Sequence, residues 1–306
     1  MTATSVVDEP PARSTFQRRL RAVVSVGGPL LIVAVIVYVV ATHGHDIVET
    51  SRRLKPSELI AITALALVTL ICRTEALVVC LDAMPSVRPR RVDLHSANSL
   101  TFLAGTINHY LQAVVRGALV KRVDPARAPT IPQMVVVDTA TGLIEAIVVA
   151  VLIVVSTATL HLAWWVPALI VAAGLAGVAV VVIARRRFGH HQLLRGLDVF
   201  SDSRRTVIVA LLMIVVIVCQ VIRALIVLRA VGLHPSLLQA VATFVAGGVL
   251  STLFAGPGAG TAGGPLLVFG HRHLALAATA GLALSITLLI AGILYVLPGG
   301  PTFLVR

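Results

Sequence analysis

Long apolar runs separated by short basic segments dominate the pattern of this chain. A membrane-spanning helix needs about 20 consecutive, predominantly apolar residues. Six runs are long enough to predict full spans, and they lie at residues 23–41, 59–81, 132–155, 163–184, 207–228 and 274–297. The pattern therefore predicts an all-α fold, a polytopic transmembrane helix bundle.

Residues 98–120 form a further apolar segment, but it is interrupted by Asn108, His109, Gln112 and Arg116. If this segment crossed the membrane, the basic clusters before and after it would face opposite compartments. That arrangement conflicts with the tendency of Arg and Lys to gather in cytoplasmic loops. If the segment enters and leaves on the cytoplasmic side, most of the loop bases lie inside. We therefore expect a re-entrant segment here.

Residues 236–255 form a second interrupted segment, which is apolar but short and leads into the sequence GPGAGTAGGP. The loop charges do not decide whether this segment spans or re-enters. A short repeat adds an indication, because the sequence TFLAG at 101–105 returns as TFVAG at 243–247, each time after a span that holds one arginine. Interrupted segments in corresponding halves are typical of inverted-repeat transporters. We therefore predict an inverted repeat, with the first segment entering from the cytoplasm and the second from outside.

The composition supports a membrane location. Hydrophobic residues make up 58% of the chain and charged residues 12%, whereas a soluble domain carries about a quarter charged residues. The formal net charge of +12 would suggest a nucleic-acid partner in a soluble protein. Here the bases cluster between apolar runs, so we expect them to contact anionic membrane lipids and expect no nucleic-acid partner.

The chain divides into two regions. Residues 1–22 are polar and basic, which predicts a disordered cytoplasmic tail. Residues 23–306 form a single predicted transmembrane domain in the cell membrane, with the N-terminus in the cytoplasm. The three cysteines lie inside apolar runs, and no motif for a metal site or a catalytic nucleophile occurs. We therefore expect no metal and no cofactor.

Ionisable side chains inside the predicted spans are the strongest candidates for function. Each costs about 2.5 to 3.5 kcal/mol to insert, so such groups usually face the bundle interior and are paired. Asp138 and Glu145 are two helical turns apart and share one face of a helix. An acidic stripe opposite the arginines predicts either a path for a lipid headgroup or a set of structural ion pairs. The candidate residues are Arg73, Glu75, Asp138, Glu145 and Arg223, with Asn108 and Arg116 in the re-entrant segment.

The Gly-rich segment at 256–265 matches the pattern GxGxxG formally, but a membrane segment rather than a strand precedes it, which excludes a dinucleotide site. Gly and Pro break helices, and irregular backbone at membrane depth is tolerated where it lines a cavity. We predict a helix break that belongs to the translocation site, with an ordinary interfacial loop as the alternative. The residues of the predicted break are Gly256, Pro257, Gly258, Gly260 and Gly263.

Taken in order, three motifs make the chain resemble the lysylphosphatidylglycerol synthase transmembrane family, also called flippase-like domain proteins. They are Asn108-His109-Tyr110-Leu111-Gln112 leading to Lys121-Arg122, then Val137-Asp138, and finally Pro257-Gly258-Ala259-Gly260. The resemblance covers about residues 20 to 300. The chain departs from the family pattern at Gln112, where Pro is usual, at Thr139, where Arg is usual, and after the Gly-rich segment, where Glu is usual.

The resemblance implies translocation of a lipid between leaflets, such as an aminoacylated phospholipid or a polyprenyl-linked lipid. Because the chain ends shortly after its last span, we expect no soluble synthase domain and no enzyme activity. Two alternatives remain. One is a membrane enzyme acting on a lipid-linked substrate, with Asp138 or Glu145 as general base. The other is an accessory subunit that binds a membrane partner protein.

Overall fold

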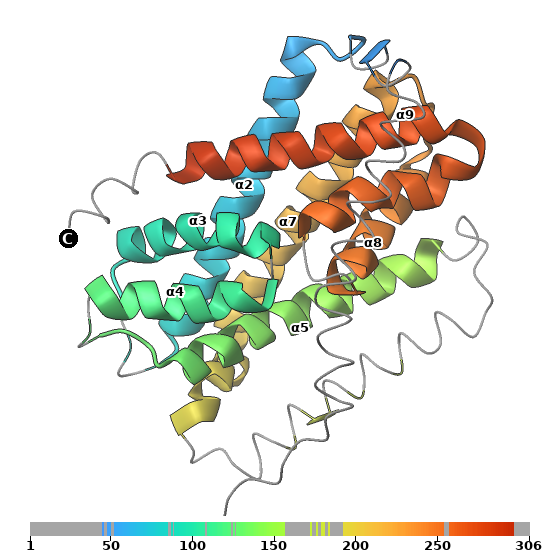
Figure 1. The fold of residues 1–306 in the computed structure, drawn as a ribbon. Coiled ribbons are helices and arrows are strands. Elements are labelled where there is room, and N and C mark those ends of the chain that lie inside the picture. The colour runs from blue at the N-terminus through green and yellow to red at the C-terminus, as the bar shows by residue number, and fades with distance from the viewer. Residues whose placement is uncertain are drawn as a thin grey trace, which may run out of the picture.

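The computed structural model of the chain describes residues 45, 48–49, 52–84, 87, 89–107, 109–123, 125, 127–156, 192–253 and 257–296, with isolated positions between 172 and 183. Every regular element in these ranges is helical (Figure 1), which confirms the all-α prediction for this part of the chain. The predictions for the tail at 1–22, for the spans at 23–41 and 163–184, and for Asn108 and Gly256 fall outside the described residues.

Among the described residues, four helices are long and apolar enough to cross a membrane. They are α2 (Pro56–Leu81), α5 (Ile131–Ser156), α7 (Ser203–Ala230) and α9 (Pro257–Val296). Each contains or overlaps one of the predicted spans. Their outward faces expose large aliphatic side chains such as Val151, Leu211 and Ile286. A polytopic helical membrane protein has this kind of apolar exterior, because its solvent is lipid.

Three shorter α-helices and one 3₁₀ helix complete the described structure. They are α3 (Arg91–Ile107), α4 (His109–Val123), α8 (Leu237–Leu253) and η1 (Gln192–Ser201). Helix α9 bends at His273, whose φ of −140° and ψ of 57° are not helical. The bend divides α9 into a first arm, residues 257–272, and a second arm, residues 274–296. The long helix α2 is therefore followed by the short helices α3 and α4 and then by the long helix α5, which we call the first half. Likewise the long helix α7 is followed by α8 and the first arm of α9, which are short, and then by the longer second arm, which we call the second half.

Local sequence signals set several helix starts. Thr130 and Gln133 form a reciprocal capping pair before α5, and Ser236 and Gln239 form the same pair before α8. Each pair satisfies backbone N–H groups that the first turn of a helix leaves free. Asp202 caps α7 by accepting hydrogen bonds from two backbone N–H groups. Pro257 opens α9, where its fixed φ suits the first helical position.

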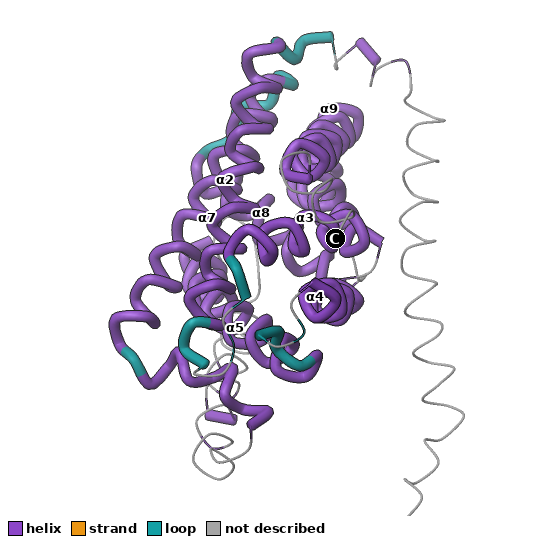
Figure 2. The backbone as a smooth tube through the Cα atoms, turned by 90° about the vertical axis from the view of Figure 1, so that its left-hand side faces the viewer, coloured by secondary structure: helices purple, strands orange, loops and turns teal. Residues whose placement is uncertain are grey.

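Helices α2 and α7 pack side by side and run in opposite directions (Figures 1 and 2). The C-terminal end of α2, around Leu81, shares a core cluster with Val209 and Met213 near the start of α7. The opposite end of α2, at Ile62, clusters with Leu228 at the end of α7. The bundle therefore has two ends, defined here as the α2 C-terminal end and the α2 N-terminal end.

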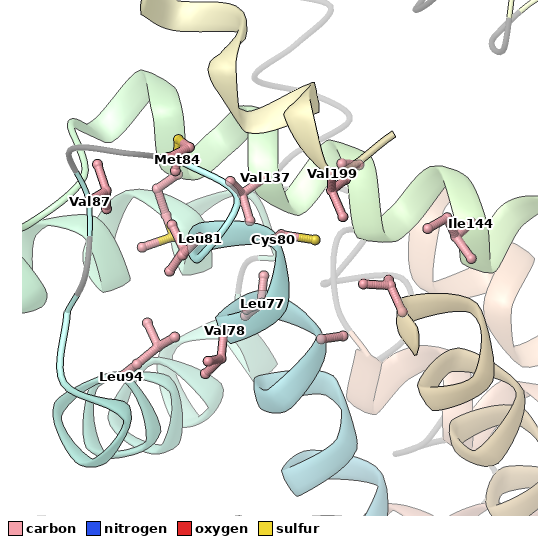
Figure 3. Packing of buried hydrophobic residues seen from close by; sticks show 14 of the residues in the cluster. Leu77, Val78, Cys80, Leu81, Met84, Val87, Leu94, Val137, Ile144 and Val199 are labelled. Carbon is pink, nitrogen blue, oxygen red and sulfur yellow. The ribbon is translucent and has the colours of Figure 1, made fainter. Parts of the chain in front are cut away.

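Each pair of short helices begins and finishes at one end of the bundle. Leu94 at the start of α3 and Val120 near the end of α4 belong to the same core cluster as Leu81 (Figure 3 shows Leu94 and Leu81). Helices α3 and α4 thus form a first hairpin that leaves and returns to the α2 C-terminal end. A single spanning helix over residues 98–120 is not formed.

The second hairpin consists of α8 and the first arm of α9, and it lies at the other end. Leu233 just before α8 and Phe269 in the first arm share a cluster with Ile62. The two hairpins therefore start from opposite ends of the antiparallel pair α2 and α7.

The predicted Gly-rich break is wrong for its described residues. Pro257, Gly258, Gly260 and Gly263 lie in the helical first arm of α9. The glycines there permit close contact between helices. A Cβ atom at Gly247 of α8 would lie 2.9 Å from the carbonyl oxygen of Gly260, so the two backbones touch directly. Small residues allow this approach in membranes, where close packing replaces the hydrophobic effect between helices.

Candidate functional site

The first charged contact of the bundle joins the first hairpin to α5. Arg116 of α4 donates a hydrogen bond of 2.5 Å from Nη1 to Oδ1 of Asp138. The Arg116 side chain is 4% exposed and that of Asp138 is 29% exposed. Because removing the partner of a buried charge is costly, this pair fixes α4 against the start of α5.

A second charged contact joins α2 to α5. Nη2 of Arg73 donates a hydrogen bond to Oε1 of Glu145. The Arg73 side chain is 41% exposed and that of Glu145 is 21% exposed, so this pair reaches the outer surface of the bundle. Glu145 lies 14 residues after the start of α5, about 21 Å along the helix axis at 1.5 Å per residue. The pair is therefore far from both ends of its helix.

The acidic stripe on α5 has the predicted geometry, in that each of its two acids binds an arginine from a different helix. The third arginine is placed elsewhere. Arg223 of α7 is fully buried and donates hydrogen bonds to Oε1 of Gln220 at 2.6 Å, to the carbonyl oxygen of Leu284 at 3.1 Å and to Oγ1 of Thr287 at 3.3 Å. Among the described residues no acid forms an ion pair with it.

A polar network surrounds Glu75, the remaining acid within the predicted spans. His95 of α3 places Nε2 2.9 Å from Oε1 of Glu75, and its Nδ1 contacts the hydroxyl of Tyr295 in the second arm of α9. The Tyr295 hydroxyl donates to Oγ1 of Thr74 at 2.8 Å, and Nδ2 of Asn98 donates to the same oxygen at 2.6 Å. We refer to these five residues as the polar network. It ties together α2, α3 and α9.

Sequence reasoning identified Glu75 but missed the other four members of the network. The hydropathy pattern places the start of the segment at residue 98, whereas α3 begins at Arg91 and so includes His95. The signal was nevertheless present, since Asp93, His95, Ser96 and Asn98 are polar residues that open a helix whose later part is apolar.

In the described part of the chain, three buried side-chain atoms have no hydrogen-bond partner. They are Oδ1 of Asn98, Nε of Arg116 and Nε of Arg223. Buried polar atoms are normally satisfied, so each of these is a place where a bound polar group would be stabilised. Two of them belong to the first hairpin, on residues that the charged contacts or the polar network already involve, and the third belongs to the buried Arg223 of α7.

In the part of the chain that the structure describes, no group of three or more His, Cys, Asp or Glu side chains could hold a metal ion.

The fold and these contacts define a class, that of polytopic helical membrane proteins with charged and polar side chains between their helices. Comparison of the chain with protein families, with curated proteins and with solved structures finds no match.

Proposed function

We propose that this protein binds a membrane lipid and moves it between leaflets. The headgroup would pass along the polar side chains between the two hairpins while the acyl chains stay in the bilayer. The lipid would be of the kind that the family resemblance implies, an aminoacylated phospholipid or a polyprenyl-linked lipid.

The carrying observation is the Arg73–Glu145 pair at membrane depth. Ionisable groups within spans almost always face the bundle interior. Here both charged groups reach a surface whose neighbours on α2 and α5, Val68, Ile71 and Ile147, are exposed aliphatic side chains. A charged pair that opens toward lipid gives a headgroup lateral access from the bilayer, which a water-soluble substrate would not need.

The arrangement of the helices supports an inverted repeat, and such a repeat would suit a translocation mechanism. Helices α2 and α7 are antiparallel, and the hairpins that follow them start from opposite ends. The contacts between halves are reciprocal, because α3 packs on α9 and α8 packs on α5. Transporters built in this way place their substrate between two broken segments and alternate access by rocking one repeat against the other.

Loop charges orient the repeat. The α2 C-terminal end carries Arg90, Lys121, Arg122, Arg204 and Arg205, either at helix ends or close to them. We infer that this end faces the cytoplasm, in line with the positive-inside tendency. The first hairpin then enters from the cytoplasm and the second from outside. With residues 23–41 and 163–184 as further spans, the protein would have six spans.

The experiment is lipid translocation in liposomes that contain the full-length protein and a leaflet-selective fluorescent phospholipid. Replacing both partners, as in Arg73→Gln with Glu145→Gln, keeps the site neutral overall but removes its charges. We expect at least a tenfold slower movement with an unchanged folded yield. The matched control is Arg205→Gln with Asp202→Asn, which removes the exposed pair at the start of α7.

Different outcomes would favour the other functions. Equal rates in the charge-free double variant and the wild type would refute the role of this pair. A chemically altered lipid, seen by mass spectrometry of the same liposomes, would indicate a membrane enzyme. No movement and no chemistry in the wild type would favour an accessory subunit.

A further inference from the structure

The hydrogen atoms of the polar network can be assigned by counting donors and acceptors. The Thr74 hydroxyl donates to the carbonyl oxygen of Leu70 at 2.9 Å, so its oxygen accepts from both Asn98 and Tyr295. A tyrosine has one hydroxyl hydrogen. Since Tyr295 donates that hydrogen to Thr74, it can only accept at the contact with His95. Nδ1 of His95 therefore carries a hydrogen.

This assignment determines what lies between His95 and Glu75. A neutral imidazole with its hydrogen on Nδ1 presents a lone pair at Nε2. That lone pair would face a carboxylate oxygen at 2.9 Å, which is repulsive unless a proton lies between the two atoms. Either an imidazolium donates to a carboxylate or a protonated Glu75 donates to a neutral imidazole. In both cases the His95–Glu75 pair holds one proton more than a neutral histidine and an ionised glutamate would hold separately.

The position of the pair links this proton to the packing of the helices. His95 lies on the first hairpin, Glu75 on the central helix α2, and Tyr295 on the last helix of the second half. Loss of the proton would set the Nε2 lone pair against the carboxylate and weaken the contact of α3 with α2. The carboxylate would still be held by Arg91, whose Nη1 lies 3.9 Å from Oε2 of Glu75.

The other charged groups around the pair are already engaged. Arg116 of α4 binds Asp138. Arg73 of α2 binds Glu145. The pair is half-buried, whereas Arg91 is mostly exposed at the α2 C-terminal end, so protons can reach the pair from that end.

From this geometry we propose that His95 and Glu75 form a proton-binding site that couples lipid movement to protonation from the α2 C-terminal end. With the proton bound, the network holds the first hairpin onto α2 and α9. When the proton leaves, this hold weakens, and Arg91 of the same hairpin keeps its longer contact with Glu75. The coupling rests on the proposed lipid translocation, while proton binding by the pair does not.

The first test measures the hairpin itself. Spin labels at Val92→Cys on α3 and Ile71→Cys on α2, both exposed positions, report the distance between these helices after the native cysteines are replaced by alanine. We expect a longer and broader distance at about pH 8 than at about pH 5, the range in which histidine changes its charge. Glu75→Gln, whose amide can donate to Nε2 in place of the proton, should keep the short distance at both values. A distance independent of pH in the wild type would overturn the proton-binding site.

The second test measures coupling in liposomes with and without an imposed pH gradient. The wild type should move the fluorescent phospholipid at least tenfold faster in one gradient direction, whereas Glu75→Gln and His95→Asn should lose this dependence. Arg205→Gln serves as the control that keeps it. Lipid movement unaffected by the gradient in the wild type would refute the coupling alone. Absence of lipid movement under every condition would refute the proposed function, and the spin-label distances would then decide on the proton site.

Discussion

Helix α3 packs on the second arm of α9, and helix α8 packs on α5. The contact of α3 contains the polar network together with Phe102, Leu288 and Ala291. The contact of α8 is aliphatic, with Ile153 against Val241 and Val245 and with Val221 of α7 beside them.

The difference between these two contacts shows whether packing at such a position requires polar side chains. Because the α8 contact is packed with apolar side chains, a helix in this kind of position does not need hydrogen bonds to pack. Polar groups at membrane depth carry a cost, and this network leaves Oδ1 of Asn98 without a partner. The polar network is therefore better explained by chemistry in the first half than by packing, which is the basis of the proton-binding proposal.

The two hairpins also differ in the kind of contact that distinguishes each of them. In the second hairpin the backbones of Gly247 and Gly260 are in contact, and a Cβ at Gly264 would overlap the carbonyl oxygen of Thr243. The first hairpin instead contributes Arg116 and the polar network. Close backbone packing distinguishes the second hairpin, and charge and hydrogen bonds added to apolar packing distinguish the first. The following predictions test this contrast.

The largest effect is expected from Gly260→Leu. Its new side chain would overlap the carbonyl oxygen of Gly247 and the hydroxyl of Ser251. Overpacking costs about 1 to 3 kcal/mol where the surroundings can move, and backbone cannot move aside easily. We expect no folded protein by size-exclusion chromatography in detergent. Gly248→Leu, next to Gly247 but exposed and with open space around it, should fold normally; equal loss in both variants would mean that close packing is not the cause.

A smaller loss is expected from Arg116→Met, which leaves Asp138 without its partner. Removing one member of a buried pair costs about 3 to 5 kcal/mol. Adding Asp138→Leu should restore most of the stability, because the double variant buries no charge. Thermal unfolding in detergent measures both. The control is Arg205→Met, which removes one partner of the exposed pair at the start of α7 and should change stability by about 1 kcal/mol or less.

Tyr295→Phe should have a moderate effect. It removes the hydroxyl that Thr74 and His95 share, and an unsatisfied buried polar group costs about 1 to 3 kcal/mol. In the aliphatic contact, Ile153→Val deletes one methylene and should cost about 1 kcal/mol. If Tyr295→Phe is neutral while Ile153→Val is not, the network does not stabilise the α3 contact. Chemical denaturation of both variants gives the comparison.

The smallest perturbation is a pair of labelling variants that leave stability unchanged. Lys121→Cys at the end of the first hairpin should react with an impermeant thiol reagent only from the cytoplasmic side. Arg272→Cys at the end of the second hairpin should react only from outside. Both positions are exposed. Reaction of the two cysteines from the same side would contradict the inverted repeat.

The sequence alone determined which segments are long apolar helices, because hydropathy adds up over neighbouring residues and needs no knowledge of packing. The four described long helices follow the predicted runs, and the interruption within residues 98–120 was visible as polar residues in an apolar segment. The sequence also predicted that the two acids of α5 would pair with arginines, since charges at membrane depth need partners.

Only the tertiary structure decided which partners meet. Arg116 and Arg73, not Arg223, bind the acids of α5, because that depends on which helices pack and at what height. His95 and Tyr295 are 200 residues apart and meet only when the last helix crosses the first hairpin. The prediction that the glycines of 257–265 break the helix is wrong for a related reason. Glycine weakens an isolated helix, yet it favours one whose backbone must touch another helix, and that second helix is not visible in the local sequence.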